Sequence, residues 1–166
     1  MKYFIGIPIP KDYKHKIEML RAEFSFFSTE PHITIVPPPS LPDNDSFIKN
    51  TVEVCRKTEK FHIKLGSLEQ FGRRVLYVSV DSPELISLYN DLFQSLGLKK
   101  EARDYTPHLT VIKERPKKKI DIDIARKRAE VKLPEFSEYI LNSVTIYRQP
   151  RERFIYVPYM QIPIGR

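Results

Sequence analysis

The 166-residue chain, with 41% hydrophobic and 11% aromatic residues, holds enough apolar material to bury the core of one domain. Charged residues, at 30%, are interleaved with apolar ones instead of gathering in long blocks, which argues against a disordered chain and for an ordinary globular surface. The net charge of +7 favours phosphate-bearing partners such as nucleic acid or nucleotides, although a basic surface also serves solubility alone.

Cysteine content and hydropathy indicate a reducing compartment. Cys55 is the single cysteine, so no internal disulfide can form, and no Cys/His cluster has the spacing of a zinc site. The apolar run 3–9 is interrupted by Pro8 and followed by Lys11 and Asp12, which makes it too short for a signal peptide. No stretch approaches the roughly 18 apolar residues of a membrane span. We therefore expect a soluble, cytoplasmic protein without a metal, a cofactor, membrane contact or an obligatory protein partner.

The first half of the chain predicts a strand, a helix and a second strand. Residues 3–7 are strand-like, and after Pro10 apolar residues recur at helical spacing: Tyr13, Ile17, Leu20 and Phe24. The unit ends on the sequence Pro-His-Ile-Thr-Ile-Val at 31–36. A possible second helix follows at about 43–58, and residues 61–65 predict another strand.

The second half of the chain predicts the same order of elements. Residues 75–80 are strand-like, and Pro83 opens a stretch with apolar residues at helical spacing: Leu85, Leu88, Tyr89, Leu92 and Leu96. Pro-His-Leu-Thr-Val-Ile follows at 107–112, then a possible helix at about 120–130 and a strand over 139–146.

This repeated order indicates an internal duplication. His32 and His108 lie 76 positions apart, and each follows a strand and a proline-started helix. A chance match of two short strings is the alternative, but the shared preceding elements make it much less favoured. We expect a single domain, 1–166, with two related lobes and repeat units of about 1–72 and 73–166. Helices would cover the sheets of an α+β or α/β body.

The two His-x-Thr strings place chemistry on one face of each strand. Because side chains alternate along a strand, His32 and Thr34 point to one face, as do His108 and Thr110, while the apolar residues between them point to the other. If the lobes meet about a pseudo-twofold axis, both pairs converge on one cleft. One neutral histidine can then take a proton from water while the other, protonated, gives a proton to the departing alkoxide. The threonine hydroxyls can donate to phosphate oxygens. A single such histidine would more often be structural, but the pair favours phosphodiester hydrolysis.

Four further residues are candidates for substrate contact: Lys113 beyond the second motif, Tyr105 before it, and Tyr3 and Tyr77 on equivalent strands. Arg103 and Thr106 also lead into the second motif. His15 and His62 lack a matching threonine and are expected to be structural or solvent-facing.

Two basic clusters could guide or stack a polyanion. The first is Arg115 with Lys117, Lys118 and Lys119, for which a solvated loop is the favoured interpretation. The second lies near Tyr147 and Phe154 and consists of Arg148, Arg151 and Arg153.

The motifs at 31–35 and 105–111 resemble the two signature motifs of the 2H phosphoesterase superfamily. That superfamily includes LigT-like RNA 2′,3′-cyclic phosphodiesterases and 2′-5′ RNA ligase-like proteins, and the opening Met-Lys-Tyr and compact length are similar to its bacterial YjcG-like branch. The resemblance covers essentially the whole chain. This sequence differs in having three prolines at 37–39 and Lys113 where arginine is usual.

The resemblance implies a bilobal α+β fold in which two antiparallel-type sheets face a central cleft and helices pack on the outside. It also implies metal-independent chemistry on RNA or nucleotides with a 2′ linkage. The implied catalytic set is His32, Thr34, His108 and Thr110.

Two classes of function remain open at this point. The first is an enzyme that hydrolyses a 2′,3′-cyclic phosphate or a 2′-5′ bond; the second is an RNA-end or cyclic-nucleotide binding module with little turnover. ATP-driven ligation has no support, because the sequence has neither a Walker-type glycine-rich loop nor a lysine-centred nucleotidyl-transfer motif. Which histidine acts as base, and whether a 2′- or 3′-phosphate is formed, do not follow from the sequence.

Overall fold

The computed structural model describes residues 1–135, 137–151 and 154–165. The first elements along the chain are β1 (Lys2–Pro8), α1 (Lys11–Glu23), β2 (His32–Val36), two 3-10 turns, η1 (Pro38–Ser40) and η2 (Asp45–Phe47), α2 (Ile48–Lys57) and β3 (Phe61–Phe71). The second set is β4 (Val75–Asp81), α3 (Pro83–Ser95), β5 (His108–Lys113), α4 (Ile122–Lys132), β6 (Ser137–Leu141), β7 (Ser143–Gln149) and β8 (Val157–Pro163). These elements confirm the predicted α+β class.

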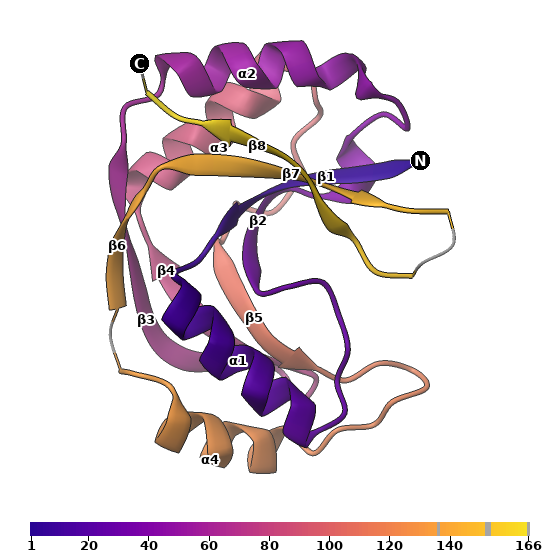
Figure 1. The fold of residues 1–166 in the computed structure, drawn as a ribbon, viewed down its shortest axis with the longest axis vertical. Coiled ribbons are helices and arrows are strands. Elements are labelled where there is room, and N and C mark those ends of the chain that lie inside the picture. Colours follow the sequence, from indigo (N-terminus) through magenta and orange to yellow (C-terminus); the bar gives the residue numbers. More distant parts are fainter. Residues whose placement is uncertain (136, 152–153, 166) are drawn as a thin grey trace.

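The strands form one curled antiparallel sheet in the order β6-β3-β4-β5-β2-β1-β7-β8 (Figure 1). This order is symmetric about its centre, so that β5 matches β2, β4 matches β1, β3 matches β7 and β6 matches β8. Within the described strands, β2 and β5 are paired at Ile33 and Leu109 alone. The sheet therefore consists of two four-stranded halves, joined through the two strands that carry the His-x-Thr motifs.

Each half of the sheet contains strands from both halves of the chain. β1 and β2 lie in one half of the sheet, but β3 pairs with β4 and β6 in the other. The helices are exchanged in the same way, because α1 packs against α4 and β5, while α3 packs against α2 and β2. The lobes therefore do not coincide with continuous segments, and the boundary near residue 72 remains a prediction about repeat units only.

The helices bury the apolar residues of the inner strands. Ser82 begins α3, because its hydroxyl accepts a hydrogen bond from the Leu85 amide and Pro83 supplies the first helical residue. The apolar residues within both motif strands are fully buried: Ile33, Ile35, Leu109 and Val111. The polar residues of these strands consequently point to the face that the core does not occupy.

Two parts of the fold differ from the sequence-based expectation. The strand expected over 139–146 is broken at Asn142, because β6 pairs with β3 in one half of the sheet and β7 pairs with β1 in the other. The last strand, β8, was not expected from the sequence; it contains Pro158 and Pro163 and lies at a sheet edge, where missing N–H donors are tolerated. No helix in the described part of the chain has the length and apolar character needed to cross a membrane.

Candidate active site

Both His-x-Thr motifs lie on the two central strands, with their polar residues on the same face. His32 and Thr34 on β2 are half-buried, as are His108 and Thr110 on β5. Extending the antiparallel register from the Ile33–Leu109 pair by one residue sets Thr34 opposite His108 and His32 opposite Thr110. The structure thus brings together the four residues that the sequence predicts as catalytic.

A cavity of about 510 Å³ opens beside Thr34 and His108. Its remaining walls combine apolar or aromatic groups with a few charged side chains: Ile35, Pro37, Phe71, Tyr89, Phe93, Glu101, Arg103, Asp104, Tyr105 and Thr106. An apolar cavity with few polar groups is the usual form of a small-ligand site. His32 and Thr110 are not among its lining residues, so the cavity extends to the His108 side of the paired motifs.

The two imidazoles are held by the same type of hydrogen bond. Nδ1 of His32 lies 2.6 Å from the carbonyl oxygen of Glu30, and Nδ1 of His108 lies 3.0 Å from that of Thr106. A carbonyl accepts only, so each Nδ1 carries the proton and donates it. When an imidazole is neutral its Nε2 has a free lone pair, and when it is protonated Nε2 becomes the second donor. Each histidine therefore presents Nε2 as its reactive atom.

His32 is enclosed by aromatic rings. The centroid of Phe4 lies 4.8 Å from that of His32 and that of Tyr147 lies 5.2 Å away, while Phe4 and Tyr147 stack on each other at 4.5 Å. Burial lowers the pKa of His32 to about 4, and the nearby positive charges of Arg21 and Lys113 act in the same direction, against the hydrogen bond to Glu30. His32 is therefore neutral at neutral pH, the state that a general base requires.

The carboxylate of Glu30 organises the surroundings of His32. The Tyr147 hydroxyl donates to its Oε1 at 3.0 Å, and the Lys14 ammonium lies 2.8 Å from its Oε2. Burial raises the pKa of the Tyr147 hydroxyl, with Glu30 acting in the same direction, so it remains a donor at neutral pH. Glu30 thus holds the ring that packs on His32, while its own carbonyl accepts from the imidazole.

His108 packs against two aromatic side chains, one on β3 and one on β4. The rings of Phe71 and Tyr77 stack with their centroids 4.1 Å apart. Each ring makes a T-shaped contact with the imidazole of His108, with centroid separations of 5.3 Å for Phe71 and 5.6 Å for Tyr77. Phe71 is 44% exposed, which is unusual for a phenylalanine. Phe71 was not among the residues predicted from the sequence, although it lies 76 positions before Tyr147, the same offset as between the two histidines.

Of the four predicted substrate contacts, three lie near the motifs and one does not. Tyr77 touches His108, and Tyr105 lines the cavity with its hydroxyl 2.7 Å from the carbonyl of Thr34. Lys113 ends β5, and burial together with Arg115 and Arg21 lowers the pKa of its ammonium. Tyr3, in contrast, is 7% exposed and packs against Phe47 in the core. It has the same side-chain direction as the fully buried Ile5 and Ile7, so its expected place in the cleft is not supported.

The basic clusters have different environments. Lys117, Lys118 and Lys119 are exposed in the turn after β5, as expected for a solvated loop, whereas Arg115 donates to the Phe27 carbonyl and the Ser28 hydroxyl. In the second cluster the Arg148 guanidinium lies over the Tyr159 ring at 4.4 Å and Arg151 is exposed. Arg153 lies outside the described residues.

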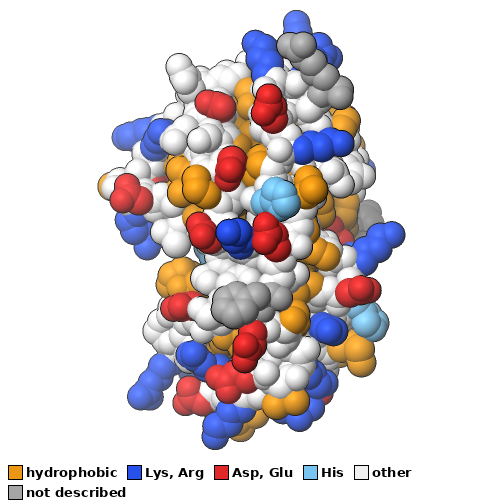
Figure 2. All heavy atoms as spheres, turned by 90° about the vertical axis from the view of Figure 1, so that its left-hand side faces the viewer, with side chains coloured by type: hydrophobic (Ala, Val, Ile, Leu, Met, Phe, Trp, Pro, Cys, Tyr) orange, Lys and Arg blue, Asp and Glu red, His pale blue; other side chains and the backbone are white. Residues whose placement is uncertain are grey.

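The two remaining histidines are located as expected. His15 is exposed on α1, and His62 on β3 forms an ion pair with Glu138 of β6 at 2.9 Å. The face that carries β3 and β6 shows acidic and basic side chains interspersed, with no continuous basic region (Figure 2). Among residues 1–135, 137–151 and 154–165, no cluster of three or more His, Cys, Asp or Glu side chains is arranged to hold a metal ion.

Comparisons with known proteins agree with the geometry. The model of the 2′-5′ RNA ligase superfamily matches residues 15–153. A crystal structure of a phosphoesterase superposes with a TM-score of 0.65 at 19% identity, covering 99% of this chain and 98% of that one. E. coli LigT complexed with 3′-AMP gives 0.65 at 19% identity, with coverage of 98% and 97%. The MHV ns2 PDE domain gives 0.54 at 14% identity, with coverage of 88% and 98%. Among curated proteins, none matches the sequence.

Proposed function

The chain belongs to the 2′-5′ RNA ligase superfamily, and we propose that it is a phosphodiesterase that hydrolyses 2′,3′-cyclic phosphate or 2′-5′ bonds in RNA or nucleotides. Membership of this superfamily supports phosphodiesterase chemistry in general. The observation that carries the finer proposal is the matched pair of histidines, each with Nδ1 bound to the carbonyl two residues earlier, which leaves Nε2 as the nitrogen for proton transfer. Two imidazoles with free Nε2 atoms on neighbouring strands supply the base and the acid that a phosphodiester hydrolysis needs.

His32 is the proposed general base. Its low pKa keeps Nε2 unprotonated, so it can take a proton from a water molecule as the water oxygen attacks phosphorus. The resulting imidazolium holds one proton on each nitrogen, and the proton on Nδ1 remains bound to the Glu30 carbonyl. Protonating an enclosed imidazole is costly, and the aromatic rings around it limit its movement during the transfer.

His108 is the proposed general acid. In its protonated form Nδ1 donates to the Thr106 carbonyl, so the second proton lies on Nε2 and is given to the alkoxide that leaves when its bond to phosphorus breaks. The hydroxyls of Thr34 and Thr110 lie beside the opposite histidine in the register and would donate to the non-bridging oxygens. Water and the cleaved bond thus yield one phosphomonoester and one hydroxyl group.

Nucleotide substrates are supported by the surroundings of His108. The cavity is large enough for a nucleoside and is lined by aromatic rings, on which a base can stack. Lys113 adds a positive charge at the end of β5. E. coli LigT, which has the same fold, was crystallised with 3′-AMP.

The proposal is tested by hydrolysis of nucleoside 2′,3′-cyclic phosphates and 2′-5′ dinucleotides in EDTA, with identification of the product. We expect turnover of at least one of these substrates, and loss of about 10³-fold or more in His108→Asn, because asparagine can replace the Nδ1–H donor but not the acid at Nε2. His62→Asn, which alters an exposed histidine on β3, is the matched control and should keep wild-type turnover. Tight binding of a cyclic phosphate without product would contradict an enzyme and indicate the binding module instead.

A further inference from the structure

The relative position of the two His-x-Thr units depends on a short junction. β2 and β5 are paired at Ile33 and Leu109 within the described strands, so one residue pair joins the strands that carry all four site residues. One pair does not fix the twist and separation of two strands as firmly as a full ladder does. Other contacts must therefore determine how far apart the two imidazoles lie.

Arg21 of α1 supplies such a contact on the β5 side. Its Nη2 donates to the carbonyl of Thr110 at 2.9 Å, its Nε to the carbonyl of Val111 at 2.7 Å and its Nη1 to the carbonyl of Thr29 at 2.8 Å. Val111 is the extra residue of a β-bulge, since Ile112 pairs with Leu76 and Thr110 with Tyr77. The guanidinium is buried and binds main-chain carbonyls of the second motif and of the segment that leads into β2.

Tyr105 supplies the matching contact on the β2 side. Its hydroxyl donates to the carbonyl of Thr34 at 2.7 Å, while its ring stacks on Tyr89 of α3 at 4.2 Å. A Cβ built on Gly6 of β1 would lie 3.0 Å from the Ile33 carbonyl, which places that carbonyl toward β1. Consecutive carbonyls of a strand point to opposite edges, so the Thr34 carbonyl points to the β5 side, where Tyr105 meets it.

Each of these two side chains lies in one half of the chain and binds the motif of the other half. Arg21 precedes β2 and binds the threonine carbonyl of β5, whereas Tyr105 precedes β5 and binds the threonine carbonyl of β2. The two contacts therefore fix α1 to β5, and the segment packed on α3 to β2. Burying a charged guanidinium is costly, and its hydrogen bonds to three carbonyls offset this cost while they fix the positions of those carbonyls.

We propose that Arg21 and Tyr105 are positioning residues, which set the relative placement of the two His-x-Thr units by holding the main-chain carbonyls of Thr110 and Thr34. This inference rests on the proposed function, since it assigns the two residues a part in the same reaction. Neither residue needs to touch the phosphate to have this effect.

The test is the kinetics of Tyr105→Phe and Arg21→Lys on the best substrate of the wild-type protein. Phenylalanine keeps the stacking on Tyr89 and lysine keeps the positive charge, so both variants should fold. We expect kcat to fall about tenfold in Tyr105→Phe and about a hundredfold in Arg21→Lys, with KM within about threefold of the wild type, because misplaced catalytic groups impair the transition state more than substrate binding. Replacement of Arg21 by Met should cost more than replacement by Lys.

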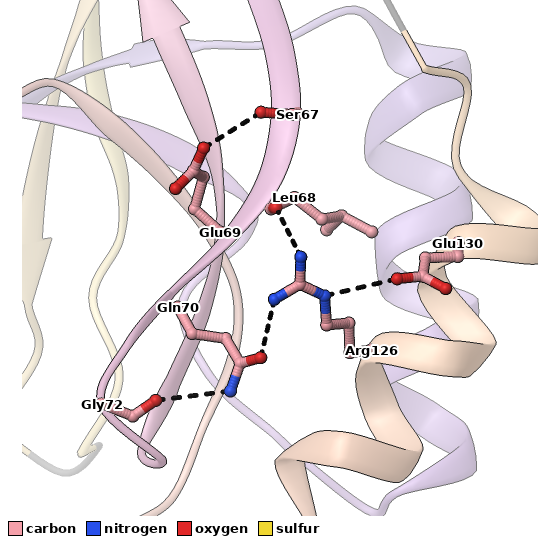
Figure 3. Close-up of polar contacts among 7 residues, drawn as sticks. All are labelled: Ser67, Leu68, Glu69, Gln70, Gly72, Arg126 and Glu130. Carbon is pink, nitrogen blue, oxygen red and sulfur yellow. Dashed lines mark hydrogen bonds and ion pairs between the residues drawn. The ribbon is translucent and has the colours of Figure 1, made fainter.

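Matched controls separate this effect from a general loss of stability. Arg126 of α4 donates to the Leu68 carbonyl and the Gln70 side chain of β3, and also pairs with Glu130 (Figure 3). The Thr58 hydroxyl donates to the Val54 carbonyl at 2.8 Å at the end of α2, away from both motif strands. Arg126→Lys and Thr58→Val remove side-chain bonds to main-chain carbonyls outside the motifs, and we expect both to keep kcat within about threefold of the wild type.

A second readout does not need turnover. The amide nitrogens of Ile35 and Val111 share peptide groups with the two bound carbonyls, so their NMR signals should move in Tyr105→Phe and Arg21→Lys respectively, together with the ring signals of His32 and His108. Folded variants with unchanged kcat would overturn the inference, as would unmoved histidine signals. A wild-type protein without turnover contradicts the proposed function instead, and the NMR comparison then decides whether the contacts position the two motifs.

Discussion

His32 and His108 have the same hydrogen bond but different surroundings. His32 is enclosed by Phe4 and Tyr147, beside the charges of Arg21 and Lys113, whereas His108 adjoins the cavity. The two repeats therefore share the strand, the motif and a stacked aromatic pair against the imidazole, but they differ in that His32 lies near two positive charges and His108 borders the cavity. This difference supports the proposed assignment of His32 as the base, because an imidazole that is protonated only with difficulty suits that role.

The pH dependence of hydrolysis follows from this assignment. Because the pKa of His32 is lowered to about 4, the base stays neutral as the pH falls below the ordinary histidine value. We expect the acid limb of kcat/KM to lie well below pH 6.5, and to move to higher pH in Lys113→Gln, which removes a nearby positive charge. Initial rates measured between pH 4 and 9 test both points. An acid limb near 6.5 that Lys113→Gln leaves in place would contradict His32 as the base.

Strands β2, β5 and β3 bring the proposed catalytic residues and the aromatic residues beside them together, and only part of this arrangement was predictable from the sequence. Period-2 alternation and the repeat correctly placed His32, Thr34, His108 and Thr110 on one face. The same alternation cannot distinguish the two faces of a strand whose residues are all apolar, which is why Tyr3 was expected in the cleft and lies in the core. Phe71 was not predicted, because β3 continues to Phe71 beyond the apolar run 61–65 that indicated the strand.

In the proposed function, the exposed ring of Phe71 beside His108 offers a surface on which a base can stack. A base stacked on this ring beside His108 should contribute about 1–3 kcal/mol. Phe71→Ala should therefore raise KM for nucleoside 2′,3′-cyclic phosphates by about tenfold, while Phe71→Tyr keeps a stacking surface and a near wild-type KM. Steady-state kinetics on ribose 2′,3′-cyclic phosphate, which has no base, is the control. An equal rise in KM on that substrate would show that Phe71 acts on the fold rather than on a base.

Because elements are exchanged between the lobes, we expect the whole molecule to fold as one unit. The sequence indicated the duplication, but not that β3 and the helices cross between the lobes, because pairing partners far apart in the chain leave no local pattern. The turn at Gly72, with a positive φ of 57°, joins β3 to β4 and lies on the predicted repeat boundary. Each repeat contributes one His-x-Thr unit, so a complete site needs both.

Cutting the chain at this turn tests the exchange. Residues 1–72 alone leave β3 without β4 and β6, and residues 73–166 alone leave β7 without β1. We expect each fragment to be unfolded by circular dichroism and amide exchange, and an equimolar mixture to regain the fold and hydrolysis. Autonomous folding of either fragment would contradict the exchanged packing.

Both histidines are proposed to act on one phosphorus atom, and a double-variant cycle on kcat tests whether they do. Wild type, His32→Asn, His108→Asn and the double variant are compared on one substrate in EDTA. If the two imidazoles act in one concerted transfer, each single variant should lose about 10³-fold or more, and the double variant should lose little beyond the more damaging single one. Losses that multiply, or a single variant that retains wild-type kcat, would contradict the account.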